Sequence, residues 1–268
     1  MAEKLWFQFQ VSSFKFSYYD TAVAFDVNEY MDSFCRLADE NGFAREVVAR
    51  VADYEIPVYT KIKSGAPRIY LSSGVHGDEP SGPLALMELL GEGLLSNEVS
   101  WMLCPLLNPS GMEAGTRENS SGVDLNRDYL RRASAEVRGH VDWLERQPVP
   151  DVFLSLHEDW ESTGFYLYEI QKSVCASVAH AILEAASLEI GPEPSPLIDD
   201  HNVREPGWIF HEPRADIPAD WPEAIYMADR GTQVSYTMET PSSLELSRRV
   251  ACHKLAVCKA VEEFLLPT

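Results

Sequence analysis

Three residues of this 268-residue sequence have the types and positions of metal ligands. His76 and Glu79 stand three residues apart, directly after an apolar segment typical of a buried strand and on the first turn of an expected helix. Zinc accepts imidazole nitrogen and carboxylate oxygen, and a catalytic zinc site needs a third protein ligand with one position left for water. His157 follows the apolar run 151–156 and is the best candidate for that ligand. The pattern therefore predicts one Zn²⁺ ion held by these three side chains.

The other histidines are weaker candidates. His140, His180 and His253 fall within expected helices, where an imidazole is usually solvated or satisfied within the core. His201 and His211 lie in a long irregular stretch, and we treat them as possible substrate contacts.

A polar, turn-rich stretch over 108–129 separates the expected ligands and carries two arginines, Arg117 and Arg127. Either arginine could be an ordinary surface residue. A guanidinium group can also bind a carboxylate through two parallel hydrogen bonds, or stabilise an oxyanion. Lys and Arg total only 22 in this chain, against 42 Asp and Glu. Two arginines so near the expected ligands therefore favour a functional role.

Alternating strands and helices are expected to position these residues. The alternation predicts a single-domain three-layer α/β/α fold with a central mixed, mostly parallel sheet. The candidate ligands fall at strand ends, where α/β proteins bind their ligands. We expect no regular structure over 190–232. Helices are expected over 28–41, 84–95, 134–146, 173–188 and 243–265, and strands in a hairpin after residue 43 and over 68–74, 100–107, 151–156, 164–170 and 233–238.

The composition is that of a globular protein, with 45% hydrophobic and 24% charged residues. A net charge of −20 repels phosphate backbones, which argues against a nucleic-acid partner. No apolar run approaches the 18 or more residues of a membrane span, and the N-terminus lacks the apolar core of a signal peptide. The five cysteines form no C-x-x-C pair. We therefore expect a cytoplasmic protein with reduced thiols and no membrane partner.

The motifs, taken in order, resemble those of the zinc carboxypeptidase family. The order is H-x-x-E at 76–79, N-P-x-G at 108–111, T-R at 116–117, D-L-N-R at 124–127, a strand that ends in His157 and a late strand that ends in Glu239. The resemblance covers roughly residues 65–266 and implies a catalytic domain over 65–268 that binds one zinc ion. Residues 1–64 are expected to belong to the same domain, either as a small cap or as extra edge strands.

The resemblance also implies roles for individual residues. Glu239 corresponds to the general base, and Arg117 to the arginine that polarises the scissile carbonyl. Asn126 and Arg127 correspond to the pair that binds the terminal carboxylate of the substrate. Asp124 corresponds to an acid that orients the first histidine ligand. The family's substrate-capping tyrosine has no clear motif here, and Tyr226 lies in about the right stretch for it.

Within the family, the compact spacing and the 115–127 segment are most similar to the murein peptide amidase-like branch. The expected function is hydrolysis of an amide bond next to a free carboxylate in a short peptide, such as a cell-wall peptide. One alternative is an N-acyl amino acid deacylase of the succinylglutamate desuccinylase/aspartoacylase type, which shares the H-x-x-E and D-L-N-R motifs. A second alternative is a non-catalytic module that binds a metal ion or a carboxylate.

Overall fold

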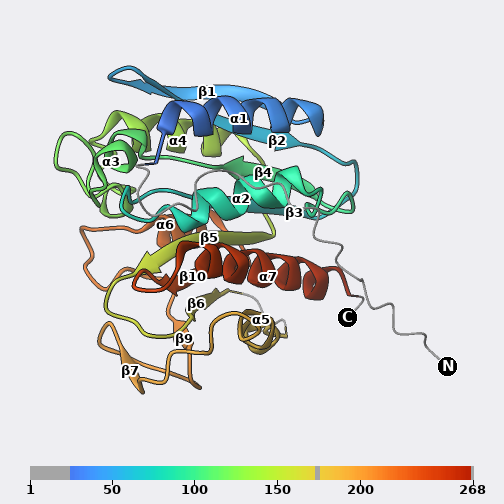
Figure 1. The fold of residues 1–268 in the computed structure, drawn as a ribbon, viewed down its shortest axis with the longest axis vertical. Helices are drawn as coiled ribbons and strands as arrows, with labels where there is room; N and C mark the ends of the chain where they lie inside the picture. Colours follow the sequence, from blue (N-terminus) through green and yellow to red (C-terminus); the bar gives the residue numbers. More distant parts are fainter. Residues whose placement is uncertain (1–24, 173–175, 267–268) are drawn as a thin grey trace.

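A computed structural model describes residues 25–172 and 176–266, and a mixed sheet of eight strands runs through it (Figure 1). In spatial order the strands are β1 (Ala44–Val51), β2 (Tyr54–Lys61), β4 (Ser100–Cys104), β3 (Arg68–Ser73), β5 (Val152–Asp159), β10 (Val234–Pro241), β6 (Tyr166–Gln171) and β9 (Trp208–His211). The strands β4, β3, β5 and β10 are parallel to one another, β6 is antiparallel to β10, and β9 is parallel to β6. The prediction of a mixed, mostly parallel sheet is confirmed.

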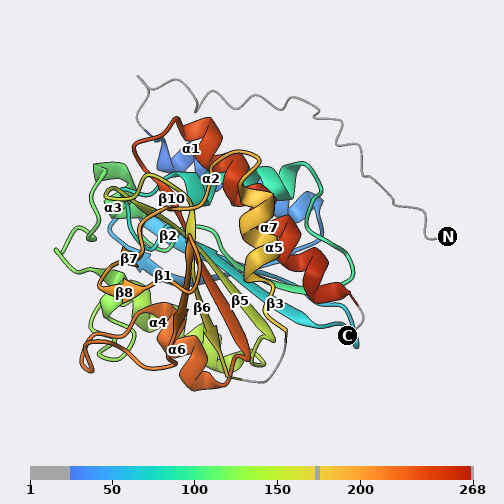
Figure 2. The same ribbon diagram turned by 90° about the horizontal axis from the view of Figure 1, so that it is seen from below.

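Helices cover both faces of the sheet and complete the predicted three layers (Figure 2). The core on one face is built with α1 (Val27–Glu40), α2 (Ser81–Gly91), α5 (Ala179–Ala186) and α7 (Leu246–Leu265). The core on the other face is built with α4 (Ala135–Arg146) and α6 (Glu223–Arg230). None of the described helices is both long enough and apolar enough to span a membrane.

The central strands are buried on both faces of the sheet, which explains why their sequences are continuous apolar runs. In β3, Ile69 and Leu71 pack into the core beneath α2, whereas Tyr70 packs into the core beneath α4. Each of these side chains is fully buried. Because successive side chains of a strand point to opposite faces, both cores need apolar residues from the same short segment.

Residues 25–64 supply extra edge strands. The β1–β2 hairpin extends the sheet through pairing of β2 with β4, and α1 packs beside it on the face of α2. Residues 1–24, the first part of the predicted N-terminal segment 1–64, lie outside the described residues. Residues 173–175, at the start of the predicted helix 173–188, also lie outside them. That helix is described from Ala179.

The expectation of an irregular stretch over 190–232 is wrong. The segment contains the β7–β8 hairpin (Leu197–Ile198 and His201–Asn202), then β9 and the helix α6. Strands of two to four residues are too short to show a periodic pattern, which explains the error. The turn-rich stretch 108–129 likewise contains a short helix, α3 (Pro109–Ala114), which Asn108 caps through a hydrogen bond from the Gly111 N–H.

Candidate functional site

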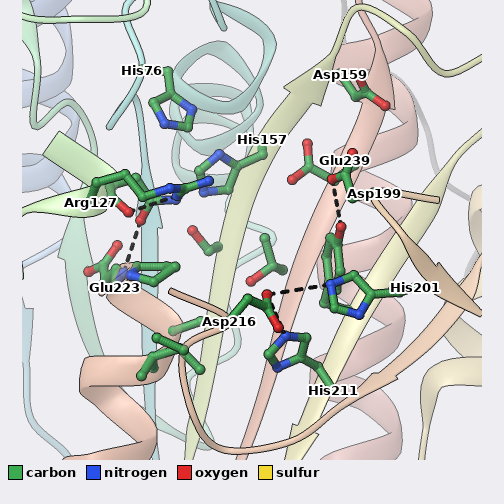
Figure 3. A pocket seen from close by; sticks show the side chains of 18 of the residues that line it. His76, Arg127, His157, Asp159, Asp199, His201, His211, Asp216, Glu223 and Glu239 are labelled. Atoms are coloured by element: carbon green, nitrogen blue, oxygen red, sulfur yellow. Dashed lines mark hydrogen bonds and ion pairs between the residues drawn. The ribbon is translucent and has the colours of Figure 1, made fainter. Parts of the chain in front are cut away.

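The parallel strands β3, β5 and β10 end at the same edge of the sheet, and the candidate residues gather there. His157 on β5 pairs directly with Glu239 on β10. Residues that pair directly in neighbouring strands project their side chains to the same face. His76 follows the end of β3, which lies on the other side of β5. Side chains far apart in the sequence therefore line one cavity of about 460 Å³ (Figure 3).

Glu79 lies between the two candidate histidine ligands. Its Oε1 atom is 2.6 Å from Nδ1 of His76, and its Oε2 atom is 2.9 Å from Nδ1 of His157. All three side chains are buried, and their ligand atoms lie within 4.8 Å of one another. Burial opposes ionisation of Glu79, but the two histidines outweigh it and lower the pKa of that carboxyl group. Two imidazole nitrogens and a carboxylate fit the ligand preference of zinc.

Asp124 holds His76 in the orientation that this site needs. The Nε2–H group of His76 donates a hydrogen bond to Oδ1 of Asp124 at 3.2 Å. The ring therefore presents the lone pair of Nδ1 to the site, because a neutral imidazole carries only one N–H. The second oxygen of Asp124 accepts a hydrogen bond from Nε of Arg117 at 3.0 Å. One carboxylate thus fixes both a candidate ligand and a candidate oxyanion-binding group.

The N-P-x-G motif positions this assembly by close backbone packing. A Cβ atom on Gly77 would lie 1.9 Å from the carbonyl carbon of Gly111, so only glycine allows the His76 turn to approach α3 this closely. The side-chain amide of Asn108 donates to the carbonyl oxygen of Arg117 at 3.1 Å. The motif therefore joins the turn of the first ligand to the loop of the arginine.

Asn126 and Arg127 line the same cavity from the 3₁₀ turn Leu125–Arg127. The side-chain oxygen of Asn126 accepts a hydrogen bond from the backbone N–H of Glu223 at 2.9 Å, which leaves its NH₂ end as a donor. Nη1 of Arg127 donates to the carbonyl oxygen of Asn126 at 2.9 Å. Two groups that can donate hydrogen bonds to an anion are thus held side by side.

Glu239 is partly exposed to the cavity. Burial, then the negative charges of Glu79 and Asp159, raise the pKa of Glu239 well above its ordinary value. Its carboxylate is therefore surrounded by groups that favour uptake of a proton, as a general base requires.

Part of the chain matches a family model and curated relatives. Residues 65–190 match the family model of the succinylglutamate desuccinylase/aspartoacylase catalytic domain. Carboxypeptidase 2 of Trichophyton rubrum is 29% identical over 99 residues, which are 34% of this chain and 18% of that protein. The chain therefore matches less than a fifth of the length of this relative.

Solved structures with the same fold cover most of the chain. A proposed metallopeptidase from Shewanella denitrificans superposes with a TM-score of 0.79 at 23% identity, covering 89% of this chain and 90% of that chain. A metallo-carboxypeptidase from Burkholderia cenocepacia has a TM-score of 0.65 at 16% identity, covering 90% and 70%. Bovine thrombin-activatable fibrinolysis inhibitor has a TM-score of 0.64 at 16% identity, covering 92% and 98%.

The chain therefore has the fold of these solved structures.

Of the predicted site residues, Asp124 and Tyr226 are not among the described residues that line the cavity. Asp124 reaches the site through its hydrogen bonds with His76 and Arg117. Tyr226 is held in the core instead. It lies on α6 with 4% of its surface exposed, and its ring packs against that of Tyr129. Its burial in the core beside Tyr129 assigns it to packing.

Several residues of the cavity wall were not predicted as site residues. Tyr166 and Tyr168 come from β6, and Asp199 accepts a hydrogen bond from the Tyr168 hydroxyl at 2.7 Å. His201 and His211, noted only as possible contacts, line this wall together with Asp216. Pairing of β6 with β9 brings His211 beside Tyr168, and the β7–β8 hairpin supplies Asp199 and His201. No local spacing in the sequence signals this arrangement.

Proposed function

We propose that this protein is a zinc-dependent carboxypeptidase or amidase that cleaves an amide bond next to a free carboxylate in a short peptide. The observation that carries the proposal is that His76, Glu79 and His157 line one cavity together with Glu239 and two arginines. His76, Glu79 and His157 would hold the zinc ion. When bound, zinc lowers the pKa of water and polarises a carbonyl group.

Arg127 and Asn126 would bind the terminal carboxylate of the substrate. A guanidinium group and a neighbouring amide match the two oxygens of a carboxylate, and charge-assisted hydrogen bonds are the stronger kind. Because both donors are anchored, Asn126 by Glu223 and Arg127 by the Asn126 carbonyl, little freedom is lost on binding.

Glu239 would act as the general base and then as the general acid. Its carboxylate accepts a proton from the attacking water and delivers that proton to the leaving nitrogen. Arg117 would donate hydrogen bonds to the oxygen on which negative charge develops, and Asp124 keeps its guanidinium in place. A module that only binds a metal or a carboxylate would need neither Glu239 nor Arg117, which argues against the non-catalytic alternative.

The second candidate function is deacylation of an N-acyl amino acid. The match of residues 65–190 to the desuccinylase/aspartoacylase model favours it. The separation of seven residues between Arg117 and Asp124 is longer than in that branch and favours the peptidase. We further propose a murein peptide as the natural substrate, on the resemblance of the 115–127 segment to the murein peptide amidase-like branch.

A panel of substrates tests the proposal. The zinc-loaded protein would be assayed with a γ-D-glutamyl-diaminopimelate peptide, ordinary dipeptides, and N-succinyl and N-acetyl amino acids, each with a free and an amidated carboxylate. We expect turnover of peptides with a free carboxylate, with the murein peptide fastest. Preference for N-acyl amino acids would establish the deacylase, and no turnover of any compound would refute an enzyme of either kind.

A further inference from the structure

A second group of potential metal ligands faces the cavity from the wall formed by β6 and β9. His201 lies on β8, His211 ends β9, and Asp216 lies in the loop that follows. The Nε2 atoms of both histidines approach the same oxygen of Asp216, at 3.5 Å for His201 and 3.2 Å for His211. The ligand atoms of the three residues lie within 4.8 Å of one another, and their side chains point toward one another in Figure 3.

The hydrogen bonds of His211 show which of its nitrogens faces the cluster with a lone pair. Its Nδ1–H group donates to the carbonyl oxygen of Glu212 at 2.6 Å. In the neutral ring Nε2 therefore carries a lone pair, and that lone pair is directed at the carboxylate of Asp216. A cation between two electron-rich atoms in this position, either a proton or a metal ion, would relieve their repulsion. A backbone carbonyl that fixes the tautomer is also the usual outer partner of a histidine that ligates a metal.

Tyr168 holds the two imidazole rings in place. Its ring meets His201 and His211 edge-on, with centroids 5.8 and 6.1 Å away, and the two histidine rings are 4.9 Å apart. The hydroxyl group of Tyr168 is anchored on Asp199. Tyr168, a residue of the central sheet, thus packs against both histidines and restricts their movement, as a rigid ligand set requires.

The electrostatic setting also favours a cation. Among the described residues that line the cavity, acids outnumber the arginines, and the net charge of the whole chain is −20. A cleft lined mainly by one sign of charge concentrates ions of the opposite sign.

We propose that His201, His211 and Asp216 form a second site for a divalent transition-metal ion such as Zn²⁺, in the same cavity as His76, Glu79 and His157. Two imidazoles and one carboxylate suit such an ion and leave coordination positions open to the cavity. The side chain of Asp216 is 67% exposed, so the ion binds more weakly here than at the buried site. This site stands independently of the proposed peptidase activity.

Metal stoichiometry tests this second site without any activity assay. The protein would be stripped with a chelator and titrated with Zn²⁺ by calorimetry and with Co²⁺ by visible absorption. We expect two equivalents, one tight and one at least tenfold weaker. His211→Asn, His201→Asn and Asp216→Asn should each abolish the weaker equivalent and retain the tight one. Glu79→Gln should weaken the tight equivalent and retain the other.

The exposed His180 on α5 supplies the matched control, because its side chain is 64% exposed and lies outside the cavity lining. His180→Asn should keep both equivalents. A single equivalent in the wild-type protein would overturn the proposal, since His201 and His211 would then share only protons with Asp216. A second equivalent that survives all three cluster variants would also overturn it, as would loss of both equivalents in each of them.

Discussion

Glu239 pairs directly with His157 across the parallel strands β10 and β5. The register of the sheet therefore fixes the distance between the proposed base and a proposed ligand, and no mobile loop intervenes. Parallel pairing also places the turn after β3, with His76, at the same edge. Catalytic geometry that rests on a buried sheet is more rigid than geometry that rests on loops.

Replacing Glu239 by Gln should lower kcat by about 10²- to 10⁴-fold, because the amide cannot accept the proton of the attacking water. Bound zinc should be unchanged, since Glu239 is not among the proposed ligands. Steady-state kinetics and metal analysis would check both. Glu184→Gln, at an exposed acid of α5, serves as the control and should have wild-type kinetics. Wild-type kcat in the Glu239 variant would remove this residue as the base.

Replacing Arg127 by Ala should raise KM for substrates with a free carboxylate by about 10- to 100-fold, the range expected for a hydrogen bond to a charged group. Amidated substrates should be affected little, because they lack the anion that Arg127 binds. KM values for matched pairs of substrates would measure the difference. Arg36→Ala, on the exposed side of α1, should change neither value. Equal effects on both members of a pair would contradict the anchoring role.

Replacing Asp124 by Asn should weaken zinc binding by about 10- to 100-fold. The Asn side chain can accept from His76 or from Arg117 only through one oxygen, whereas Asp124 serves the two residues with separate oxygens. Competition with a chromogenic chelator would give the affinity. Asp142→Asn, on the exposed face of α4, is the control. Unchanged affinity in the Asp124 variant would show that His76 needs no such partner.

Replacing Gly77 by Ala should destabilise the protein by about 1–3 kcal/mol, the usual cost of overpacking. The new methyl group would overlap the Gly111 backbone, which cannot move aside as a flexible side chain could. Urea unfolding would give the change in free energy. Gly191→Ala is a matched control, because a Cβ atom there meets nothing within 4 Å. Equal stability of the two variants would contradict the close approach of the two turns.

Glu223 should make the stability of the fold depend on pH. Burial raises the pKa of Glu223 to about 7, while hydrogen bonds from Tyr70 and Ser72 lower it in part. Because the pKa of Glu223 is higher in the folded state than in the unfolded state, the protonated side chain favours folding. Its contribution to the free energy of unfolding is complete below the unfolded-state pKa of 4.5 and is lost as pH rises through about 7.

Relative to Glu223→Gln, the wild-type protein should therefore lose up to about 3 kcal/mol between pH 5 and pH 8. Urea unfolding of both proteins at the two pH values gives the double difference, in which any constant cost of the lost hydrogen bonds cancels. Parallel pH dependence of the two proteins would contradict the raised pKa.

The grouping of the three proposed ligands could be predicted from the sequence because its signals are local. An apolar strand that runs into a histidine, and a His–Glu pair at a helix start, are visible in short windows. The sequence also predicts the two strands that carry His157 and Glu239. The alternation of strands and helices along the sequence was enough to predict the three-layer arrangement.

The remaining wall of the cavity could not be predicted in this way. His211 lies beside Tyr168 because β9 pairs with β6, a contact between segments some forty residues apart. His201 comes to the same wall from the β7–β8 hairpin, and Asp216 from the loop after β9. Tyr226 is the opposite case, a residue predicted for the site that the structure places elsewhere. It falls in the right stretch of sequence, but the register of α6 turns its ring into the core beside Tyr129.

Metal dependence of hydrolysis tests the central claim most directly. The protein would be stripped of metal, its zinc content measured, and its turnover of the best peptide substrate recorded before and after Zn²⁺ is added back, for the wild-type chain and for His157→Asn. We predict that turnover is lost on stripping and restored by zinc in the wild type but not in the variant. Full turnover by wild-type protein that is shown to be free of metal would contradict the account.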